Sequence, residues 1–223
     1  QFFSRLFDSG PALQDKVLRW YKFANWLSGE ATTPRLKLSS PSTQQKVEPP
    51  LVLIQPFSAV KAKQCGPDVY QALFDALPAD TDIRITGAPD EMDKNPSYAH
   101  LLERANVSFE DAGFVELAGL LKAARLVVSV DTAVMHLSVA VGAPTLCLAS
   151  AAYVGEIVPY AINLIPSNVE FYYKSMTCKG CLGKCINSLQ NGSFKCIDEL
   201  DNPTVVSKAL RLLTRSDPTG LGP

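Results

Sequence analysis

The sequence has no run of 18 consecutive apolar residues and no strong excess of either charge. Its 21 Lys and Arg residues are balanced by 22 Asp and Glu residues, so it lacks the basic field that nucleic-acid or anionic-lipid binding requires. The first residues also lack the charged start and apolar core of a signal peptide. We therefore expect a soluble, cytoplasmic protein that binds no nucleic acid and makes at most peripheral membrane contact.

Several motifs of nucleotide-binding and hydrolytic enzymes are also absent. GxGxxG does not follow the first predicted strand, and the phosphate-binding loop GxxxxGK[ST] occurs nowhere in the chain. The motifs HExxH and GxSxG are missing as well. These absences argue against a dinucleotide cofactor and against P-loop chemistry.

Length and composition favour one α/β core with a modest appendage. The 223 residues, 47% of them hydrophobic, can bury one full core but not two. Residues 1–50 are predicted to hold an amphipathic helix over 11–28 and then a linker rich in Ser, Thr, Gln and Pro. Because the chain begins at Gln1 rather than Met, it is compatible with a fragment of a longer protein.

From Leu51 onward, short apolar runs alternate with helical segments. The predicted strands cover 51–58, 82–89, 107–113, 125–130, 144–150 and 161–165. The predicted helices cover 67–77, a segment ending near 105, 115–124, 133–142 and 205–213, the last with Asn202 as its cap and Pro203 in its first turn. Strands this uniformly apolar are typical of a parallel sheet covered on both faces. We predict a Rossmann-like α/β domain over 51–214 and a flexible tail over 215–223.

Ligands of open α/β sheets bind beyond the carboxyl ends of the strands. After the strand at 125–130, Asp131 and Thr132 stand directly before a helix, whose N-terminus offers unpaired N–H groups to phosphate. His136 lies one turn further along, on the face that it shares with Thr132, and would reach the same ligand. Taken alone, Asp131 is explained more simply as the N-cap of this helix, and His136 as a structural side chain.

Two further strand ends carry candidate residues. Ser58 is followed by Lys61 and Lys63, and a flexible ammonium group there would neutralise a pyrophosphate. The alternative is that both lysines are ordinary solvated side chains. Gly87 would let the backbone approach a flat ligand such as a base, although a tight turn explains it equally well.

Taken together, residues 51–213 resemble the C-terminal domain of glycosyltransferase family 9, the ADP-heptose:lipopolysaccharide heptosyltransferases. The strongest similarity is the run DTAVMHLSVAVGAPTLCL, which starts at Asp131. In that family an Asp-Thr-(Gly/Ala)-x-x-His sequence follows an apolar strand, and an Ala-x-Gly-x-Pro-Thr sequence leads into the next strand. The further matches are Ser58, Lys63 and Pro67 in the first loop, Gly87 with Ala88 after the second strand, and ELAGLL at 116–121.

The resemblance implies a GT-B fold, in which this domain holds the donor nucleotide and a separate N-terminal domain or chain holds the acceptor. The helix before the domain would then be an interdomain helix. By analogy, Ser58 and Lys63 would contact the donor phosphates, and Gly87 would lie near the base. The residues around the pyrophosphate and sugar would be Asp131, Thr132, Ala133 and His136. Such contacts stabilise the departing nucleoside diphosphate, and the transfer step needs no cofactor.

Two departures from the family pattern limit this prediction. The family's Lys-x-Trp-Pro becomes KQCGP at 63–67, one residue longer and without the Trp, so Lys61 is an alternative to Lys63. The acceptor domain, which carries the catalytic carboxylate in this family, is not among these residues. We predict a donor-binding domain that transfers a sugar, a heptose from ADP-heptose, to a saccharide or protein acceptor but transfers poorly alone. The alternative is a non-catalytic binding or assembly module derived from such a domain.

Four cysteines are close together in the sequence and predict a metal site within the segment 174–198. The spacing Cys178-x2-Cys181-x3-Cys185-x10-Cys196 is short enough for one tetrahedral ion, whereas Cys65 and Cys147 lie in apolar segments. Similar clusters occur in proteins related to heptosyltransferases, in some of which the ion is iron, so both Zn and Fe are open. Four protein ligands leave no position for substrate, which favours a structural role. Disulfides or reduced structural thiols are the alternative.

Overall fold

The computed structural model describes residues 6–11, 13–38 and 48–215, and these form a six-stranded parallel sheet with the order β3-β2-β1-β4-β5-β6. The strands are β1 (Leu51–Gln55), β2 (Asp82–Thr86), β3 (Val107–Glu110), β4 (Leu126–Val130), β5 (Thr145–Leu148) and β6 (Val169–Tyr172). Every neighbouring pair is parallel. This is the strand order of doubly wound nucleotide-binding folds, and it confirms the predicted Rossmann-like α/β class.

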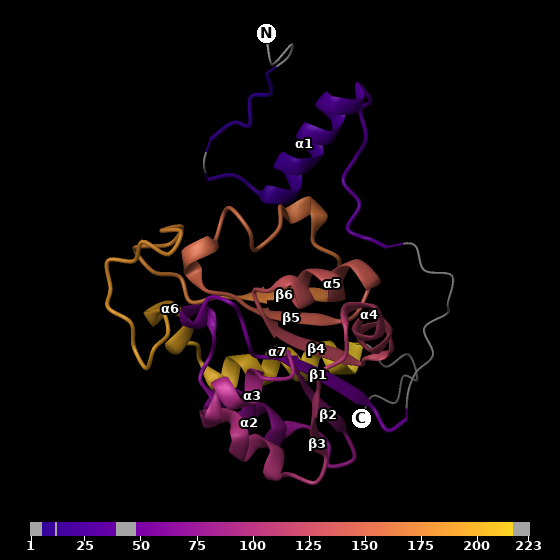
Figure 1. The fold of residues 1–223 in the computed structure, drawn as a ribbon, viewed down its shortest axis with the longest axis vertical. Helices are drawn as coiled ribbons and strands as arrows, with labels where there is room; N and C mark the ends of the chain where they lie inside the picture. The colour runs from indigo at the N-terminus through magenta and orange to yellow at the C-terminus, as the bar shows by residue number, and fades with distance from the viewer. Residues whose placement is uncertain (1–5, 12, 39–47, 216–223) are drawn as a thin grey trace.

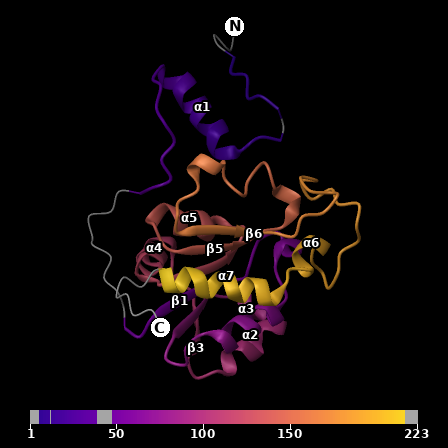
Figure 2. The same ribbon diagram turned by 180° about the vertical axis from the view of Figure 1, so that it is seen from behind.

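Helices cover both faces of the sheet (Figures 1 and 2). The α-helices are α1 (Lys16–Ser28), α2 (Pro67–Ala76), α3 (Glu91–Lys94), α4 (Phe114–Ala123), α5 (Ala133–Val141), α6 (Lys195–Asp198) and α7 (Asn202–Arg215). The 3-10 helices are η1 (Lys61–Lys63), η2 (Pro96–Glu103), η3 (Ala151–Tyr153) and η4 (Ile162–Leu164). Helices α2 and α7 pack together on one face of the sheet, while α4 and α5 pack together on the other.

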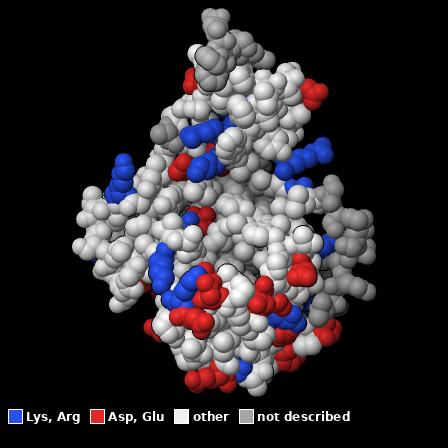
Figure 3. Space-filling view, in the orientation of Figure 1, with Lys and Arg blue, Asp and Glu red and all other residues white. Residues whose placement is uncertain are grey.

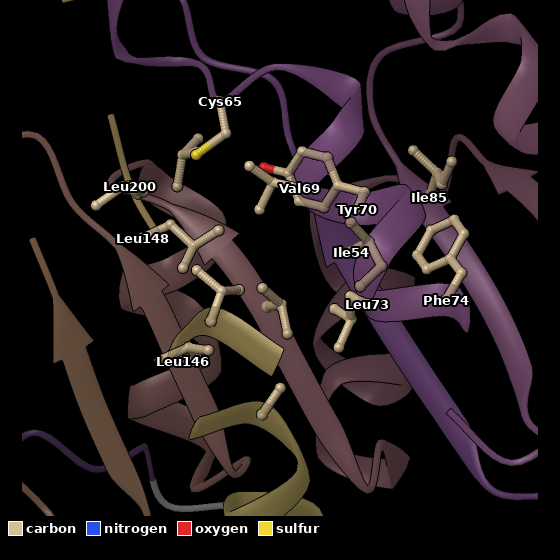
Figure 4. Packing of buried hydrophobic residues seen from close by; sticks show 14 of the residues in the cluster. Ile54, Cys65, Val69, Tyr70, Leu73, Phe74, Ile85, Leu146, Leu148 and Leu200 are labelled. Carbon is tan, nitrogen blue, oxygen red and sulfur yellow. The ribbon is translucent and has the colours of Figure 1, made fainter. Parts of the chain in front are cut away.

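Alternation along β1 shows why the strands are so uniformly apolar. Its even-numbered residues Val52 and Ile54 belong to the core cluster beneath α2 and α7, whereas Leu51 and Leu53 belong to the cluster beneath α4 and α5. Figure 4 shows the first cluster, with Ile54 beside apolar side chains of α2 and of the neighbouring strands. All five residues of β1 are buried because both faces of the sheet are covered, as the sequence predicted.

The last strand is not where the sequence placed it. The predicted strand at 161–165 is wrong, because its centre forms the 3-10 helix η4 and the strand β6 begins at Val169. The partly buried Leu164, the last residue of η4, and Ile165 pack against the third core cluster. Strand β6 pairs with β5 only and carries the partly exposed Glu170, so it lacks the continuous apolar run that marks a central strand.

Two helix starts also differ from the prediction. Helix α1 begins at Lys16 rather than near residue 11, because the Asp15 carboxylate accepts the Leu18 N–H at 2.9 Å. The other oxygen of Asp15 accepts the Ala161 N–H at 2.7 Å and so ties α1 to the domain. Helix α7 is capped by Asp201 rather than Asn202, since the Thr204 N–H donates to the Asp201 carboxylate at 2.9 Å.

The remaining parts of the predicted organisation are only partly described. The helix predicted to end near residue 105 consists of α3 and η2, which are separated at Asn95 before Pro96. Residues 1–5 and 12 of the N-terminal region, 39–47 of the predicted linker and 216–223 of the predicted tail lie outside the described residues.

None of the described helices is long and apolar enough to cross a membrane. Figure 3 shows Lys and Arg interleaved with Asp and Glu on one face, without a broad patch of either sign.

Candidate functional site

The strand order places two loops side by side at the centre of the sheet. Strands β1 and β4 are neighbours, and the chain runs outward from β1 through β2 to β3, and outward from β4 through β5 to β6. The carboxyl ends of β1 and β4 therefore mark the topological switch point, where open α/β sheets bind their ligands. The loop after β1 carries Ser58 and leads to η1, and the loop after β4 carries Asp131 and Thr132.

The N-terminus of α5 has no side-chain cap. Thr132 is the N-cap residue, with φ −143° and ψ 175°, but its side chain makes no capping hydrogen bond. The Thr132 hydroxyl is buried and has no hydrogen-bond partner within the described part of the chain. The interpretation of Asp131 as the N-cap is therefore wrong. The first turn of α5 keeps amide groups that no side chain satisfies, which is the arrangement that binds anions.

Asp131 instead forms a buried ion pair with Lys63. The Lys63 Nζ lies 2.7 Å from the Asp131 Oδ2, and the two residues are 8% and 3% exposed. The ammonium group also lies 4.9 Å from the centroid of the Tyr153 ring. Lys61, by contrast, is exposed and donates to the Lys94 carbonyl at 3.1 Å. Of the two lysines, Lys63 is thus the one brought to the start of α5, and its interpretation as a solvated side chain is wrong.

His136 faces the same ion pair from within α5. Its Nε2 lies 3.8 Å from the Asp131 Oδ1, and its Nδ1 lies 2.6 Å from the Tyr160 hydroxyl oxygen. Burial lowers the pKa of His136 below its ordinary value, against the opposing effect of the Asp131 carboxylate. The imidazole is therefore mainly neutral at pH 7 and has one N–H to donate.

A pocket of about 350 Å³ extends from the start of α5 toward the ends of β2 and β3. Ser58, Gly87 and Val134 line it, together with the exposed ring of Phe114. A Cβ at Gly87 would lie 2.9 Å from Cδ2 of Phe57, so only glycine keeps this wall in place. The structure therefore brings Ser58 and Gly87 to one pocket that reaches the first turn of α5. Ala133, the first residue of α5, is exposed beside it.

Sequence reasoning missed the two tyrosines of this site. Tyr153 belongs to η3, and Tyr160 lies in the loop between η3 and η4. Both follow β5, whose end had no motif that pointed to a ligand. Their contacts with Lys63 and His136 connect positions that are distant in the sequence, so no local spacing could have revealed them.

The cysteine segment brings three of its four cysteines together. The Sγ atoms of Cys178, Cys181 and Cys185 all lie within 4.8 Å of one another. Cys196 is outside this group, because its buried Sγ accepts the Ala151 N–H at 3.3 Å. The structure thus groups three of the four predicted ligands, and Cys196 lies outside that group. Figure 1 shows the segment as an orange loop beside α6.

Hydrogen bonds and burial shift the pKa values of the cysteine thiols in opposite directions. The Asn187 backbone N–H donates to the Cys185 Sγ at 3.4 Å and lowers the pKa of that thiol, while the Asn187 side chain donates to the Cys178 Sγ at 3.4 Å. Burial raises the pKa of Cys65 to about 12 and places that thiol outside metal or nucleophilic chemistry. All six cysteines are free thiols, without disulfides.

Comparison with known proteins places the chain in a family. The model of glycosyltransferase family 9 (heptosyltransferase) matches residues 14–186, which is more than half of the sequence. The chain belongs to glycosyltransferase family 9. This confirms the resemblance drawn from the run that starts at Asp131. A comparison with curated protein sequences gives no match.

Solved structures of two heptosyltransferases and of one family 9 protein share the fold at low sequence identity. The E. coli ADP-heptose lps heptosyltransferase II is 13% identical with a TM-score of 0.58 over 74% of this chain and 47% of its own. A glycosyl transferase family 9 protein from Veillonella parvula is 18% identical with a TM-score of 0.55, over 78% and 48%. E. coli heptosyltransferase WaaC with ADP-2-deoxy-2-fluoro heptose is 18% identical with a TM-score of 0.52, over 82% and 58%. The chain thus spans about half the length of the proteins it resembles.

Proposed function

We propose that the chain is the donor-binding half of a GT-B glycosyltransferase that transfers a sugar from a nucleoside diphosphate. One observation carries the proposal: the uncapped N-terminus of α5 lies at the switch point of the sheet, between the Lys63 and Asp131 pair and a pocket. The diphosphate would lie at the start of α5, and the nucleoside would extend along the pocket past Gly87. ADP-heptose is the favoured donor, because the similar structure of E. coli heptosyltransferase WaaC holds ADP-2-deoxy-2-fluoro heptose.

The chemistry that this half supplies is stabilisation of the leaving group. As the bond to the sugar breaks, negative charge grows on the departing nucleoside diphosphate. The amides at Thr132 and Ala133, the Lys63 ammonium and the neutral His136 ring would oppose that charge from fixed positions. Ser58 would add a hydroxyl from the opposite loop, and Asp131 would hold the Lys63 side chain in place. No metal ion is needed at the phosphates for this role.

The acceptor and the catalytic base are assigned to a second domain. The chain spans about half the length of its structural relatives, so the acceptor, a saccharide or a protein, would be held by an N-terminal domain or a separate chain. A lone donor half stabilises the leaving group but does not position a nucleophile. We therefore expect the chain alone to bind donor nucleotide and to transfer sugar poorly.

Nucleotide binding by the full chain tests this function. Titration calorimetry with ADP, UDP and GDP is expected to show binding, with ADP favoured. The Lys63→Ala and His136→Ala variants should bind about 10-fold or more weakly, because each loses a hydrogen bond to a charged ligand. The matched controls Lys61→Ala and His100→Ala remove the same side chains from exposed positions and should bind as the wild type does. Absence of binding to all three nucleotides by the wild type would refute the proposal.

We also propose that the cysteine segment holds a structural Zn or Fe ion. Three thiols within 4.8 Å and two Asn187 N–H donors directed at their sulfurs form a suitable thiolate donor set. A fourth ligand would come from Cys196 after it gives up its bond to Ala151, or from solvent. Lys174 and Lys195 are paired with Glu199, at 2.8 and 3.6 Å, so their charges are partly neutralised and would balance little of the thiolate charge.

Elemental analysis tests the metal. Protein prepared without added ions should contain about one Zn or Fe per chain, and Cys181→Ser should lose it. Cys65→Ser changes a buried cysteine away from the cluster and should keep the ion. A metal content well below one ion per wild-type chain would defeat the proposal.

The second candidate function is a binding or assembly module without catalysis. Large apolar side chains of the cysteine segment are exposed, among them Ile186 at 82% and Leu189 at 53%. Exposed apolar side chains mark a contact with another protein where they form a contiguous patch. If no nucleotide binds in the titration above, this module becomes the favoured function.

A further inference from the structure

The hydroxyl of Tyr160 makes a close contact with the ring of His136. Tyr160 is 4% exposed, and its ring packs edge-on against Phe171 with 5.2 Å between centroids. The hydroxyl oxygen lies 2.6 Å from the His136 Nδ1. The phenol is thus held by packing, and the contact with the imidazole is a hydrogen bond at short range.

The surrounding groups decide which atom donates. The Asp131 Oδ1 faces the other ring nitrogen, Nε2, at 3.8 Å, and a carboxylate favours a proton on the nitrogen it faces. Burial raises the pKa of Tyr160, so its hydroxyl stays protonated. Its other polar neighbour in the described chain is the Met135 sulfur at 4.0 Å, a weak acceptor. A neutral ring with its single proton on Nε2 must accept at Nδ1, so Tyr160 is the donor.

The Nε2 proton is left available by this arrangement. The 3.8 Å between Nε2 and the Asp131 Oδ1 is longer than a hydrogen bond. The carboxylate therefore attracts the Nε2–H group electrostatically but does not accept a hydrogen bond from it. The His136 side chain remains 39% exposed, while Asp131 is buried. An anionic oxygen at the start of α5 would therefore find a neutral N–H donor beside the Lys63 ammonium.

We propose that Tyr160 is a positioning residue that holds His136 as the neutral Nε2–H tautomer, so that the ring donates to the diphosphate of the donor nucleotide. This inference rests on the proposed function and deepens it, because it assigns the ring a fixed hydrogen-bond role. No proton is transferred in that role. Tyr160 acts only through His136, whose orientation and tautomer it sets.

The tautomer is measured directly by nitrogen NMR. The chain has two histidines, so ¹⁵N-histidine labelling gives a spectrum with two rings, and the His100→Gln variant assigns them. At pH 7 and without ligand, His136 is expected to show an acceptor-type Nδ1 and a protonated Nε2. The exposed His100 serves as an internal reference. A protonated Nδ1 with an acceptor-type Nε2, or a doubly protonated ring, would overturn the inference without any variant.

The Tyr160→Phe variant tests the cause. Loss of the hydroxyl removes the hydrogen bond that stabilises the neutral ring, so the His136 Nδ1 signal should shift and the titration midpoint of His136 should rise. ADP binding should weaken about 3- to 10-fold. Tyr172→Phe is the matched control, since its hydroxyl accepts the Asp201 N–H and does not contact His136, and it should change neither readout. Unchanged His136 signals in Tyr160→Phe would overturn the inference.

The outcomes separate this inference from the proposed function. Wild-type protein that binds ADP but has the opposite tautomer refutes the role of Tyr160 and leaves the proposed function standing. Wild-type protein with the expected tautomer but no ADP binding refutes the donor role of the ring and the proposed function together. Expected tautomer, ADP binding and a loss specific to Tyr160→Phe support both.

Discussion

At the scale of single residues, the site depends on charges that are buried together. Lys63 and Asp131 are both nearly inaccessible, and each is separated from water by the other elements around the switch point. A buried ion pair adds little net stability, yet removal of one partner leaves an uncompensated charge. Under the proposed function, the pair is explained by a need for an ammonium group at the start of α5 rather than by stability.

This explanation predicts that stability and binding can be separated. Lys63→Met leaves Asp131 unpaired and should lower the free energy of unfolding by about 3–5 kcal/mol in urea denaturation. The double variant Lys63→Met with Asp131→Leu removes both charges and should recover most of that loss. It should not recover ADP binding, as measured by calorimetry.

The control for this experiment is Lys61→Met, at the other end of η1. Lys61 is exposed, so its replacement should change the free energy of unfolding by no more than about 0.5 kcal/mol and leave ADP affinity as it is. If the double variant bound ADP as tightly as the wild type, the ion pair would have only a structural role.

At the scale of elements, the edge strand β6 is held by charge as well as by its apolar residues. Glu170 lies opposite three cationic side chains of α7, with Arg211 at 2.5 Å, Lys208 at 3.4 Å and Arg215 at 3.7 Å. Burial acts to raise the pKa of Glu170, but the hydrogen bonds from Arg211 and Lys208 outweigh it and lower that pKa below its ordinary value.

A dependence of stability on pH follows from the direction of this shift. Because the folded-state pKa of Glu170 is lower than the unfolded one, its contribution is present above the unfolded pKa, about 4.3, and is lost as the pH falls through the folded value. Glu170→Gln should therefore lower the free energy of unfolding by about 0.5–1 kcal/mol at pH 7. The difference from the wild type should shrink as urea denaturation is repeated at pH values below 4.

The matched control is Glu103→Gln, an exposed acid at the end of η2. It should show no such difference at either pH. An equal loss for Glu170→Gln at pH 7 and in acid would show that its effect comes from packing rather than from charge.

The bounds of helices and strands were predicted well where a local sequence pattern determines them, and less well where tertiary packing determines them. The central strands β1 and β4 and the helices α2 and α5 lie close to their predicted ranges, because each combines an apolar run with a clear start or stop signal. Strand β6 was misplaced because an edge strand needs fewer apolar residues. The start of α1 was misplaced because Asp15 caps the helix and also binds Ala161 across the molecule.

At the scale of the whole molecule, the strand order places loops from separate parts of the chain next to each other, where they form one site. Residues 58 and 63, after β1, are far from residue 131, after β4, in the chain, yet the neighbouring positions of β1 and β4 bring the two loops together. Helix α1 lies apart from the layers that cover the sheet, in the indigo part of Figure 1. Its backbone is tied to the domain by the Lys16 N–H, which donates to the Glu156 carbonyl at 2.8 Å.

The sequence by itself determined the fold class and the family, because uniformly apolar strands and the run beginning at Asp131 are local patterns. It also singled out the residues that now surround the start of α5. Tertiary structure alone decided that Asp131 pairs with Lys63 instead of capping the helix, that Tyr160 contacts His136, and that Cys196 lies apart from the other three thiols. Each of these depends on contacts between residues far apart in the chain, and such contacts leave no spacing in the sequence.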